Sequence, residues 1–222
     1  MTKEERLEKQ KKRLFEMRSF DDEYRRAYGQ LGGIDEVGRG PLCGPVVACC
    51  VVLHEGTGIL GINDSKKLSK KAREELYDMI LEEALAVGIG QRDNKVIDEI
   101  NILEATKLAM KDSIEKAEKM LQKRDLGPLE HVLIDAVTLN GISQSQTGIV
   151  KGDARSLSIA AASIVAKVTR DRMMEAYAEQ YPGYGFESNM GYGTEKHYDG
   201  LRKYGITPIH RLTFLKSFLE NK

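Results

Sequence analysis

A continuous apolar run extends from Val46 to Leu53, as expected of a strand that is buried on both faces. The shorter run from Ile34 to Val37 precedes it. A glycine-rich segment separates the two runs, so we expect them to pair as neighbouring strands. Short runs of β-branched and aliphatic residues predict further strands at 86–90, 130–137 and 147–150.

Apolar residues at helical spacing predict longer helices around these strands. The predicted helices are a charge-dense amphipathic segment at 3–28 that ends near Gly29, a segment from Ser69 to about Ala84, a segment from about Ile97 to Leu121, and the interior of 151–181. Ser69 is a suitable N-cap residue. Alternating strands and helices indicate an α/β domain built around a mixed sheet.

The composition changes after Tyr181, where glycine and tyrosine become frequent. Thr194 and Gly205 are suited to begin and end a short helix, and Thr207 followed by Pro208 predicts the start of a second one. We therefore divide the chain into an N-terminal helical extension (1–30), an α/β core (31–180) and a small C-terminal helical part (181–222).

Length and charge limit the possible functions. The chain has 222 residues, enough for one well-buried core, and its 34 Lys and Arg balance 34 Asp and Glu. Attraction for a polyanion must then come from a local patch. No apolar run has membrane-spanning length and the N-terminus lacks a signal-peptide core, so we expect a cytoplasmic protein without membrane contact. The cysteines are expected to be buried thiols without a function: Cys43, Cys49 and Cys50.

One local patch of cations is a candidate for phosphate contacts. It lies in a loop and at the start of a predicted helix, and it comprises Lys66, Lys67, Lys70, Lys71 and Arg73. A solvated helix face is an equally good interpretation.

Two adjacent acids, Asp35 and Glu36, lie within the first predicted strand. Neighbouring side chains of a regular strand point to opposite faces, so we expect the backbone to change direction there if both acids serve one site. Gly38, Gly40 and Pro41 are suited to that change. The alternative is an acidic turn at the edge of a sheet.

Two further acids lie on other predicted elements. Asp135 interrupts an apolar strand and needs a partner there, since an unpaired buried carboxylate is costly. Asp153 lies where a helix is expected to begin. Converging carboxylates without clustered His or Cys favour Mg²⁺ or Mn²⁺, the usual ions of in-line phosphodiester cleavage.

Tyr192 lies between two glycines in a predicted loop. A tyrosine in this setting can stack on a sugar or a base. Packing of the ring under its own loop is the alternative.

The chain resembles the bacterial ribonuclease HII family, or type 2 ribonuclease H, from about Gly32 to Phe218. The motifs that carry the resemblance are "GIDEVGRGPLCGPVV", "DSKKL", "NILEAT", "LIDAV", "VKGDARSLSIAAASIVAKVTRDRMM", "YPGYGFESNMGYGT" and "HRLTF". The resemblance implies a ribonuclease H-like mixed five-stranded sheet flanked by helices, with a small C-terminal helical part. It also implies an endonuclease that cuts RNA in RNA/DNA hybrids and at single ribonucleotides in duplex DNA, leaving 3′-hydroxyl and 5′-phosphate ends.

The resemblance further implies roles for individual residues. Asp35, Glu36 and Asp135 match the family's metal-binding acids, and Asp153 matches its fourth catalytic acid. Gly38-Arg39-Gly40 matches the loop that reads the 2′-hydroxyl, and Tyr192 matches the residue that senses the junction between ribose and deoxyribose. The implied phosphate contacts are Ser65, Lys66 and Lys67. We interpret His197 and His210, which lie in matching motifs, as structural.

Three other functions remain as alternatives. A ribonuclease HIII-like enzyme would carry a substrate-binding N-terminal domain, for which we expect no room before Ile34. A non-catalytic hybrid-binding protein would gain nothing from four acids facing phosphates. A nucleotide phosphotransferase would need a phosphate-binding loop of the G-x-x-x-x-G-K-[ST] type, which the sequence lacks. We expect a monomer, and a contact with a replication clamp is left open.

Overall fold

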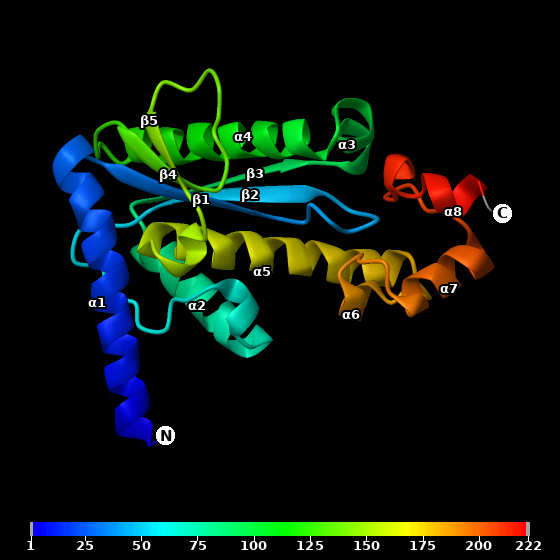
Figure 1. The fold of residues 1–222 in the computed structure, drawn as a ribbon, viewed down its shortest axis with the longest axis horizontal. Coiled ribbons are helices and arrows are strands. Elements are labelled where there is room, and N and C mark those ends of the chain that lie inside the picture. The colour runs from blue at the N-terminus through cyan, green and yellow to red at the C-terminus, as the bar shows by residue number, and fades with distance from the viewer. Residues whose placement is uncertain (1, 221–222) are drawn as a thin grey trace.

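Within residues 2–220, which the computed structural model describes, five strands form one mixed sheet in the order β3-β2-β1-β4-β5 (Figure 1). The strands are β1 (Leu31–Val37), β2 (Val46–Val52), β3 (Ala86–Arg92), β4 (His131–Asp135) and β5 (Ser145–Ile149). The first three strands pair antiparallel, whereas β1, β4 and β5 run parallel. The predicted mixed five-stranded sheet is confirmed.

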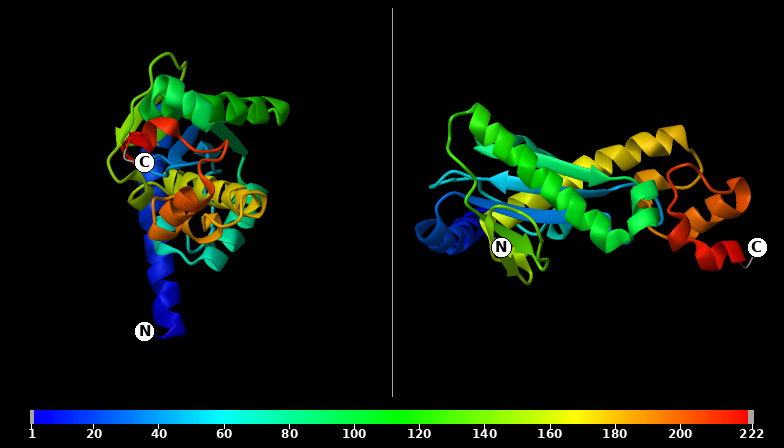
Figure 2. Two further views of the ribbon diagram at one scale, coloured as in Figure 1. Left: turned by 90° about the vertical axis from the view of Figure 1, so that its right-hand side faces the viewer. Right: turned by 90° about the horizontal axis from the view of Figure 1, so that it is seen from above.

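Helices cover both faces of this sheet. They are α1 (Lys3–Tyr28), α2 (Lys70–Glu83), α3 (Asn94–Ile100), α4 (Ile102–Lys123), α5 (Leu157–Gln180), α6 (Phe186–Asn189), α7 (Glu195–Tyr204) and α8 (Lys216–Glu220). Helix α4 lies on one face and α5 on the other, with α2 packed outside α5 (Figures 1 and 2). Helices α6, α7 and α8 gather at the end of the sheet away from α1.

The core has two main layers, one on each face of the sheet. Along β2, Ala48 and Cys50 join the apolar cluster under α4, whereas Cys49 and Val51 join the cluster under α5. This alternation explains why the sequence of β2 is apolar throughout. All three cysteines are buried free thiols, as expected.

The division of the chain at residues 30 and 180 stays a prediction, and residues 1, 221 and 222 lie outside the described part. Helix α1 contacts the core through Asp21, whose Oδ2 accepts hydrogen bonds from the backbone N–H and the hydroxyl of Ser158, at 2.8 and 2.7 Å. Among the described helices, none combines the length and apolar character needed to cross a membrane.

The helix predicted from Ile97 to Leu121 is wrong in its boundaries. The structure has two helices there, α3 and α4, because Asn101 takes a left-handed conformation with φ of 71°. Its side-chain oxygen accepts hydrogen bonds from the N–H groups of Leu103 and Glu104, at 2.9 and 3.2 Å. Asn101 therefore ends one helix and caps the next, which the apolar spacing does not show.

The helix predicted to start at Thr207 and Pro208 is also wrong. The backbone N–H of Thr207 donates to Nδ1 of His210 at 2.9 Å, and the Thr207 hydroxyl lies 2.8 Å from the same atom. The segment is a turn closed by this side chain. A 3₁₀ helix, Leu212–Phe214, follows before α8.

Two glycines of β3 allow α4 to rest directly on the sheet. A Cβ atom placed on Gly88 would lie 1.9 Å from the carbonyl oxygen of Ser113, and one on Gly90 would lie 2.0 Å from that of Ala109. Both obstacles are helix backbone, which cannot move without shifting α4. These positions therefore require glycine.

We expect Gly88→Ala to lower the free energy of unfolding by about 1–3 kcal/mol, because the added methyl group forces β3 away from α4. Urea unfolding followed by circular dichroism measures this change. Gly58→Ala is the matched control, since a Cβ atom there meets nothing within 4 Å. Equal stability of the Gly88→Ala variant and the control would contradict the close contact.

Candidate active site

The parallel pairing of β1 with β4 places two acids side by side. Ile34 pairs with Ile134, so Asp35 and Asp135, the next residues of the two strands, occupy neighbouring positions. Both isoleucines belong to the apolar cluster under α4. Because side chains alternate along a strand, the two acids lie on the α5 face.

The expectation of a change of direction between Asp35 and Glu36 is wrong. Both residues belong to β1 and pair in regular register with Cys49 and Ala48 on β2. The backbone changes direction after them, from Gly38 onward, where φ of Gly38 is 93° and where the sequence placed glycines suited to the change. Glu36 still interacts electrostatically with Asp35 and Asp135, so both adjacent acids contribute to one charged cluster without a bend between them.

Asp153 reaches the same cluster from a 3₁₀ turn, Gly152–Ala154. The backbone N–H of Gly152 donates to Oδ1 of Asp135 at 2.7 Å, which ties this turn to the end of β4. Burial raises the pKa of Asp153, and the nearby carboxylates of Asp64 and Asp135 raise it further. Asp135 thus interacts electrostatically with each of the other three acids singled out in the sequence.

Burial and mutual repulsion dominate the electrostatics of this cluster. The pKa of Asp35 is raised well above its usual value, first by burial and then by the charges of Glu36 and Asp135. Burial also raises the pKa of Glu36, although Arg39, 3.4 Å away, opposes the shift.

The carboxylate oxygen Oε2 of Glu36 is buried and has no hydrogen-bond partner within the described chain. An orphaned buried oxygen among converging carboxylates fits a hard divalent cation, which would supply the missing positive charge.

The Gly38-Arg39-Gly40 loop and Tyr192 are in contact. A Cβ atom on Gly40 would lie 3.4 Å from Cε1 of Tyr192. The N–H of Leu42 donates to the carbonyl of Gly191 at 2.8 Å, which joins the two loops. The Tyr192 side chain is 46% exposed, which favours an accessible ring over a ring packed under its own loop.

The cationic patch divides into two groups. Lys66 and Lys67 are exposed, and both lower the pKa of Asp153, so they lie beside the acids. Lys70 pairs with Glu175, and Arg73 donates to the carbonyls of Ser65 and Leu68. Lys71 lies 3.9 Å from Glu75 on the same helix.

Ser65 differs from the two lysines that follow it. Its side chain is buried, and its hydroxyl hydrogen-bonds that of Ser163 on α5 at 2.8 Å. This bond anchors the turn that carries Lys66 and Lys67.

Sequence analysis missed two fully buried arginines behind the glycine loop, Arg170 and Arg211. Arg211 donates to the carbonyls of Gly38, Arg39 and Gly44, at 2.6 to 3.0 Å. Burial lowers its pKa to about 9.

Arg170 binds the neighbouring segments in the same way. It donates to the carbonyls of Pro45, Cys43 and Met190, at 2.9 to 3.1 Å. In the sequence Arg170 is one of several charged residues in the second half of α5, beside Asp171 and Arg172, so nothing there set it apart as buried. Together the two guanidinium groups fix the backbone of both loops.

Similarity to a solved structure defines the class of protein. Ribonuclease H2 from Pyrococcus horikoshii OT3 matches the fold with a TM-score of 0.65 at 27% identity, over 86% of this chain and 98% of that one. The protein thus has a ribonuclease H-like fold, with an acid cluster at the ends of β1 and β4.

Sequence comparison then identifies the family. The ribonuclease HII family model matches residues 32–217. A ribonuclease HII from Clostridioides difficile (strain 630) is 54% identical over 214 residues, covering 96% of this chain and 81% of the relative. Another from Enterococcus faecalis (strain ATCC 700802 / V583) is 55% identical over 201 residues, covering 90% and 75%. The chain belongs to the ribonuclease HII family, which confirms the resemblance and makes the protein a ribonuclease.

The electrostatics predict an unusual effect of Asp35→Asn. Because the folded-state pKa of Asp35 is raised, its contribution to stability is fully present below the unfolded pKa of about 3.9 and is lost as the pH rises through the folded value. At pH 7 the charge therefore costs stability. Asparagine removes the charge, so the metal-free variant should be more stable than the wild type by roughly 1–2 kcal/mol.

Urea unfolding at pH 7 in the presence of a chelator measures this difference, with Asp78→Asn on the exposed face of α2 as the control. Millimolar Mg²⁺ should raise the melting temperature of the wild type and of the control but not of Asp35→Asn. Destabilisation by Asp35→Asn in chelator would refute the assignment of Asp35 as a strained, buried charge.

Proposed function

We propose that the protein is an endonuclease that hydrolyses the RNA strand of RNA/DNA hybrids and cuts on the 5′ side of single ribonucleotides embedded in duplex DNA. The products carry 3′-hydroxyl and 5′-phosphate ends. The observation that carries this proposal is the position of the four acids beside an accessible glycine loop and a half-exposed tyrosine. One short stretch of bound nucleic acid would thus meet both the acids, which are the proposed reactive groups, and the loop with Tyr192, which are the proposed sugar-recognition groups.

Asp35, Glu36 and Asp135 are the proposed ligands of Mg²⁺ or Mn²⁺, and Asp153 is the fourth catalytic acid. When bound, such cations supply an activated water and neutralise charge at the leaving oxygen. The Gly152 N–H holds one oxygen of Asp135 in place, and the Glu36 N–H does the same for Asp35, at 2.8 Å. The oxygens of these carboxylates that accept no hydrogen bond from the protein would hold the cation.

In this proposal, backbone groups of Gly38-Arg39-Gly40 recognise the ribose. Gly40 is exposed and has no side chain, so a sugar can approach its peptide group directly, whereas the Cβ position of Gly38 is occupied by Arg170. Arg211 holds the carbonyls of Gly38 and Arg39, so these peptides are oriented before substrate binds. A site built around a 2′-hydroxyl leaves its own groups unpaired on deoxyribose, which discriminates strongly between the two sugars.

Phosphate contacts are assigned to Lys66 and Lys67, which are exposed beside Asp153. Ser65 keeps a place in this substrate-binding group as the residue that anchors their turn through Ser163. Binding through these lysines is independent of base sequence.

The ribonuclease HIII-like alternative differs from the proposal in substrate, since such an enzyme would cut hybrids but not single embedded ribonucleotides. Cleavage of a labelled continuous hybrid and of a labelled duplex with one embedded ribonucleotide, each with Mg²⁺ and then Mn²⁺, tests both. Cleavage of the hybrid alone would support the alternative.

We expect Asp135→Asn to remove nearly all cleavage of both duplexes while binding of the hybrid survives, because the acid acts on the chemical step. Cleavage assays and fluorescence anisotropy measure the two properties separately. Asp78→Asn on α2 should behave like the wild type. Substantial Mg²⁺-dependent turnover by Asp135→Asn would reject the acid cluster as the catalytic site.

Tyr192→Phe removes only a hydroxyl group that we expect to hydrogen-bond near the ribose. The loss should cost about 1–3 kcal/mol of transition-state binding, and Tyr192→Ala should cost more because stacking is also lost. Both losses should be larger on the single ribonucleotide, where the junction is the only signal. Values of kcat/KM on both duplexes decide this, with the exposed Tyr204→Phe as control. Equal losses on both substrates would make Tyr192 a packing residue.

A further inference from the structure

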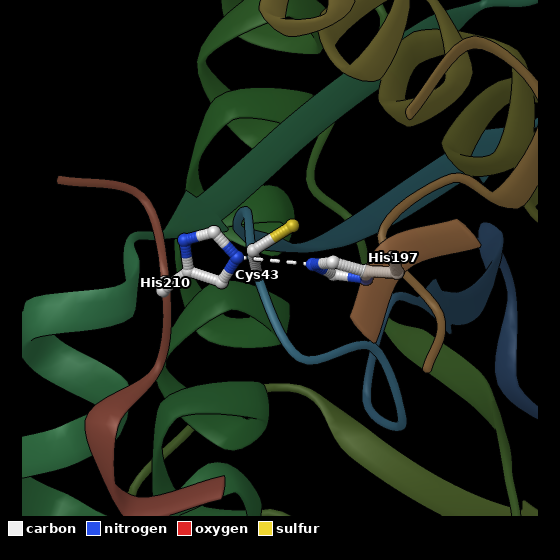
Figure 3. Close-up of side chains that lie close together, drawn as sticks. All are labelled: Cys43, His197 and His210. Carbon is white, nitrogen blue, oxygen red and sulfur yellow. Dashed lines mark hydrogen bonds between the residues drawn. The ribbon is translucent and has the colours of Figure 1, made fainter. Parts of the chain in front are cut away.

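A buried cluster of Cys43, His197 and His210 lies behind the Tyr192 loop (Figure 3). One potential ligand atom from each residue lies within 4.8 Å of the other two, and the Nε2 atoms of the histidines are 2.9 Å apart. Tyr184 and Phe186 present ring contacts to His197 and exclude water from it. The three residues could hold a soft metal ion, or the two histidines could form a hydrogen-bonded pair. The backbone groups that contact the histidine rings decide between these possibilities, because they fix where the ring protons lie.

The proton positions on the two histidine rings follow from their backbone partners, since a backbone N–H can only donate a hydrogen bond and a carbonyl can only accept one. The backbone N–H of Thr207 can only donate, so Nδ1 of His210 accepts its hydrogen bond and carries no proton. Neutral His210 then carries its proton on Nε2 and donates to Nε2 of His197. The remaining proton of His197 lies on Nδ1, which donates to the carbonyl of Tyr192 at 2.9 Å.

These proton positions oppose metal binding. A metal ion needs a free lone pair on Nε2 of both histidines, but the Thr207 N–H leaves His210 with its proton on that atom. Burial also raises the pKa of the Cys43 thiol to about 12, so no thiolate is present at neutral pH. The same burial lowers the pKa of both histidines, that of His210 to about 4. The two histidines thus form a neutral chain of hydrogen bonds beside a neutral Cys43 thiol.

The chain of hydrogen bonds ends at Tyr192, the residue proposed to recognise the substrate. The carbonyl of Tyr192 accepts two hydrogen bonds, one from the backbone N–H of Thr194 at 2.8 Å and one from Nδ1 of His197. The backbone of Tyr192 is thereby fixed while its side chain remains 46% exposed. At the other end of this hydrogen-bond chain, the Asn94 side chain of α3 donates to the carbonyl of His210 at 2.9 Å. The backbone of His210 also forms an isolated antiparallel β-bridge with that of Cys43.

We propose that His197 and His210 form a positioning pair that holds the Tyr192 carbonyl, and so sets the ring of Tyr192, for recognition of the sugar at an RNA–DNA junction. The inference rests on the proposed role of Tyr192. His197 does not touch substrate. It acts through the backbone of Tyr192, so its loss should affect junction recognition more than cleavage of a long hybrid.

Two substitutions at His197 separate positioning from packing. His197→Asn places an amide N–H close to the former Nδ1 and keeps a donor for the Tyr192 carbonyl, but it loses the acceptor for His210. His197→Gln reaches the former Nε2 and keeps the acceptor, but it loses the donor to Tyr192. His131→Asn is the matched control, since His131 is also buried and hydrogen-bonded but lies on β4 against Ser145, Thr147 and Tyr28.

The readout is the ratio of kcat/KM on the single-ribonucleotide duplex to kcat/KM on the hybrid. We expect His197→Gln to lower this ratio about tenfold, the effect of losing one hydrogen bond. His197→Asn and His131→Asn should keep the ratio within about threefold of the wild type. Equal ratios for the two His197 variants would overturn the positioning role. A wild type that does not cut the single-ribonucleotide duplex would instead reject the proposed function.

A measurement on the wild type does not depend on how the variants fold. Nitrogen-15 NMR of the histidine rings should show His197 protonated on Nδ1 and His210 protonated on Nε2. Any other pair of tautomers would overturn the hydrogen-bond chain. Stoichiometric zinc or another transition metal in the purified protein, lost in both His197 variants, would show that the cluster is a metal site and would overturn the proposal as well.

Discussion

The parallel register of β1 and β4 is the constraint on which the acid cluster depends. It brings Asp35 and Asp135 to neighbouring positions although the residues are far apart in the chain. Adjacent parallel strands are less than 5 Å apart, so the two carboxylates cannot avoid each other's charge. A register shift of one residue would turn Asp135 toward α4 and into an apolar layer, where no partner could compensate it. The hydrophobic pattern that fixes the register therefore also fixes the positions of the proposed catalytic acids.

The second requirement is a rigid backbone in the loops that we propose contact substrate, and two buried cations hold that backbone in place. Arg170 and Arg211 bind carbonyl groups rather than carboxylates. Their positive charge is therefore not cancelled by their hydrogen-bond partners. Behind a loop that we propose binds nucleic acid, such a charge favours binding of a polyanion. The same groups thus hold the loops and bias the local field toward nucleic acid.

Local patterns predicted the parts of this structure that depend on local chemistry. The apolar β2, the Ser69 cap of α2 and the buried cysteines follow from side-chain type and spacing alone. The four acids could be selected because a carboxylate in an apolar strand, such as Asp135, needs a partner. The helix break at Asn101 and the turn at Thr207 depend instead on which side chain caps a given backbone group. The spacing of apolar residues does not indicate which side chain that is. Arg211 was missed for a related reason, since its partners lie in a segment remote in sequence.

The contact between Arg211 and Gly38 spans 173 positions of the sequence. It has a consequence for the order in which the protein is made. During synthesis the acids on β1 and β4 emerge from the ribosome well before Arg211 does, so a nascent chain can assemble the sheet while the glycine loop still lacks its anchor. The loop that we propose reads the ribose therefore obtains its Arg211 anchor only in the last steps of synthesis. The distinction between ribose and deoxyribose that we propose for this loop is thus completed after the strands that carry the acids have been made.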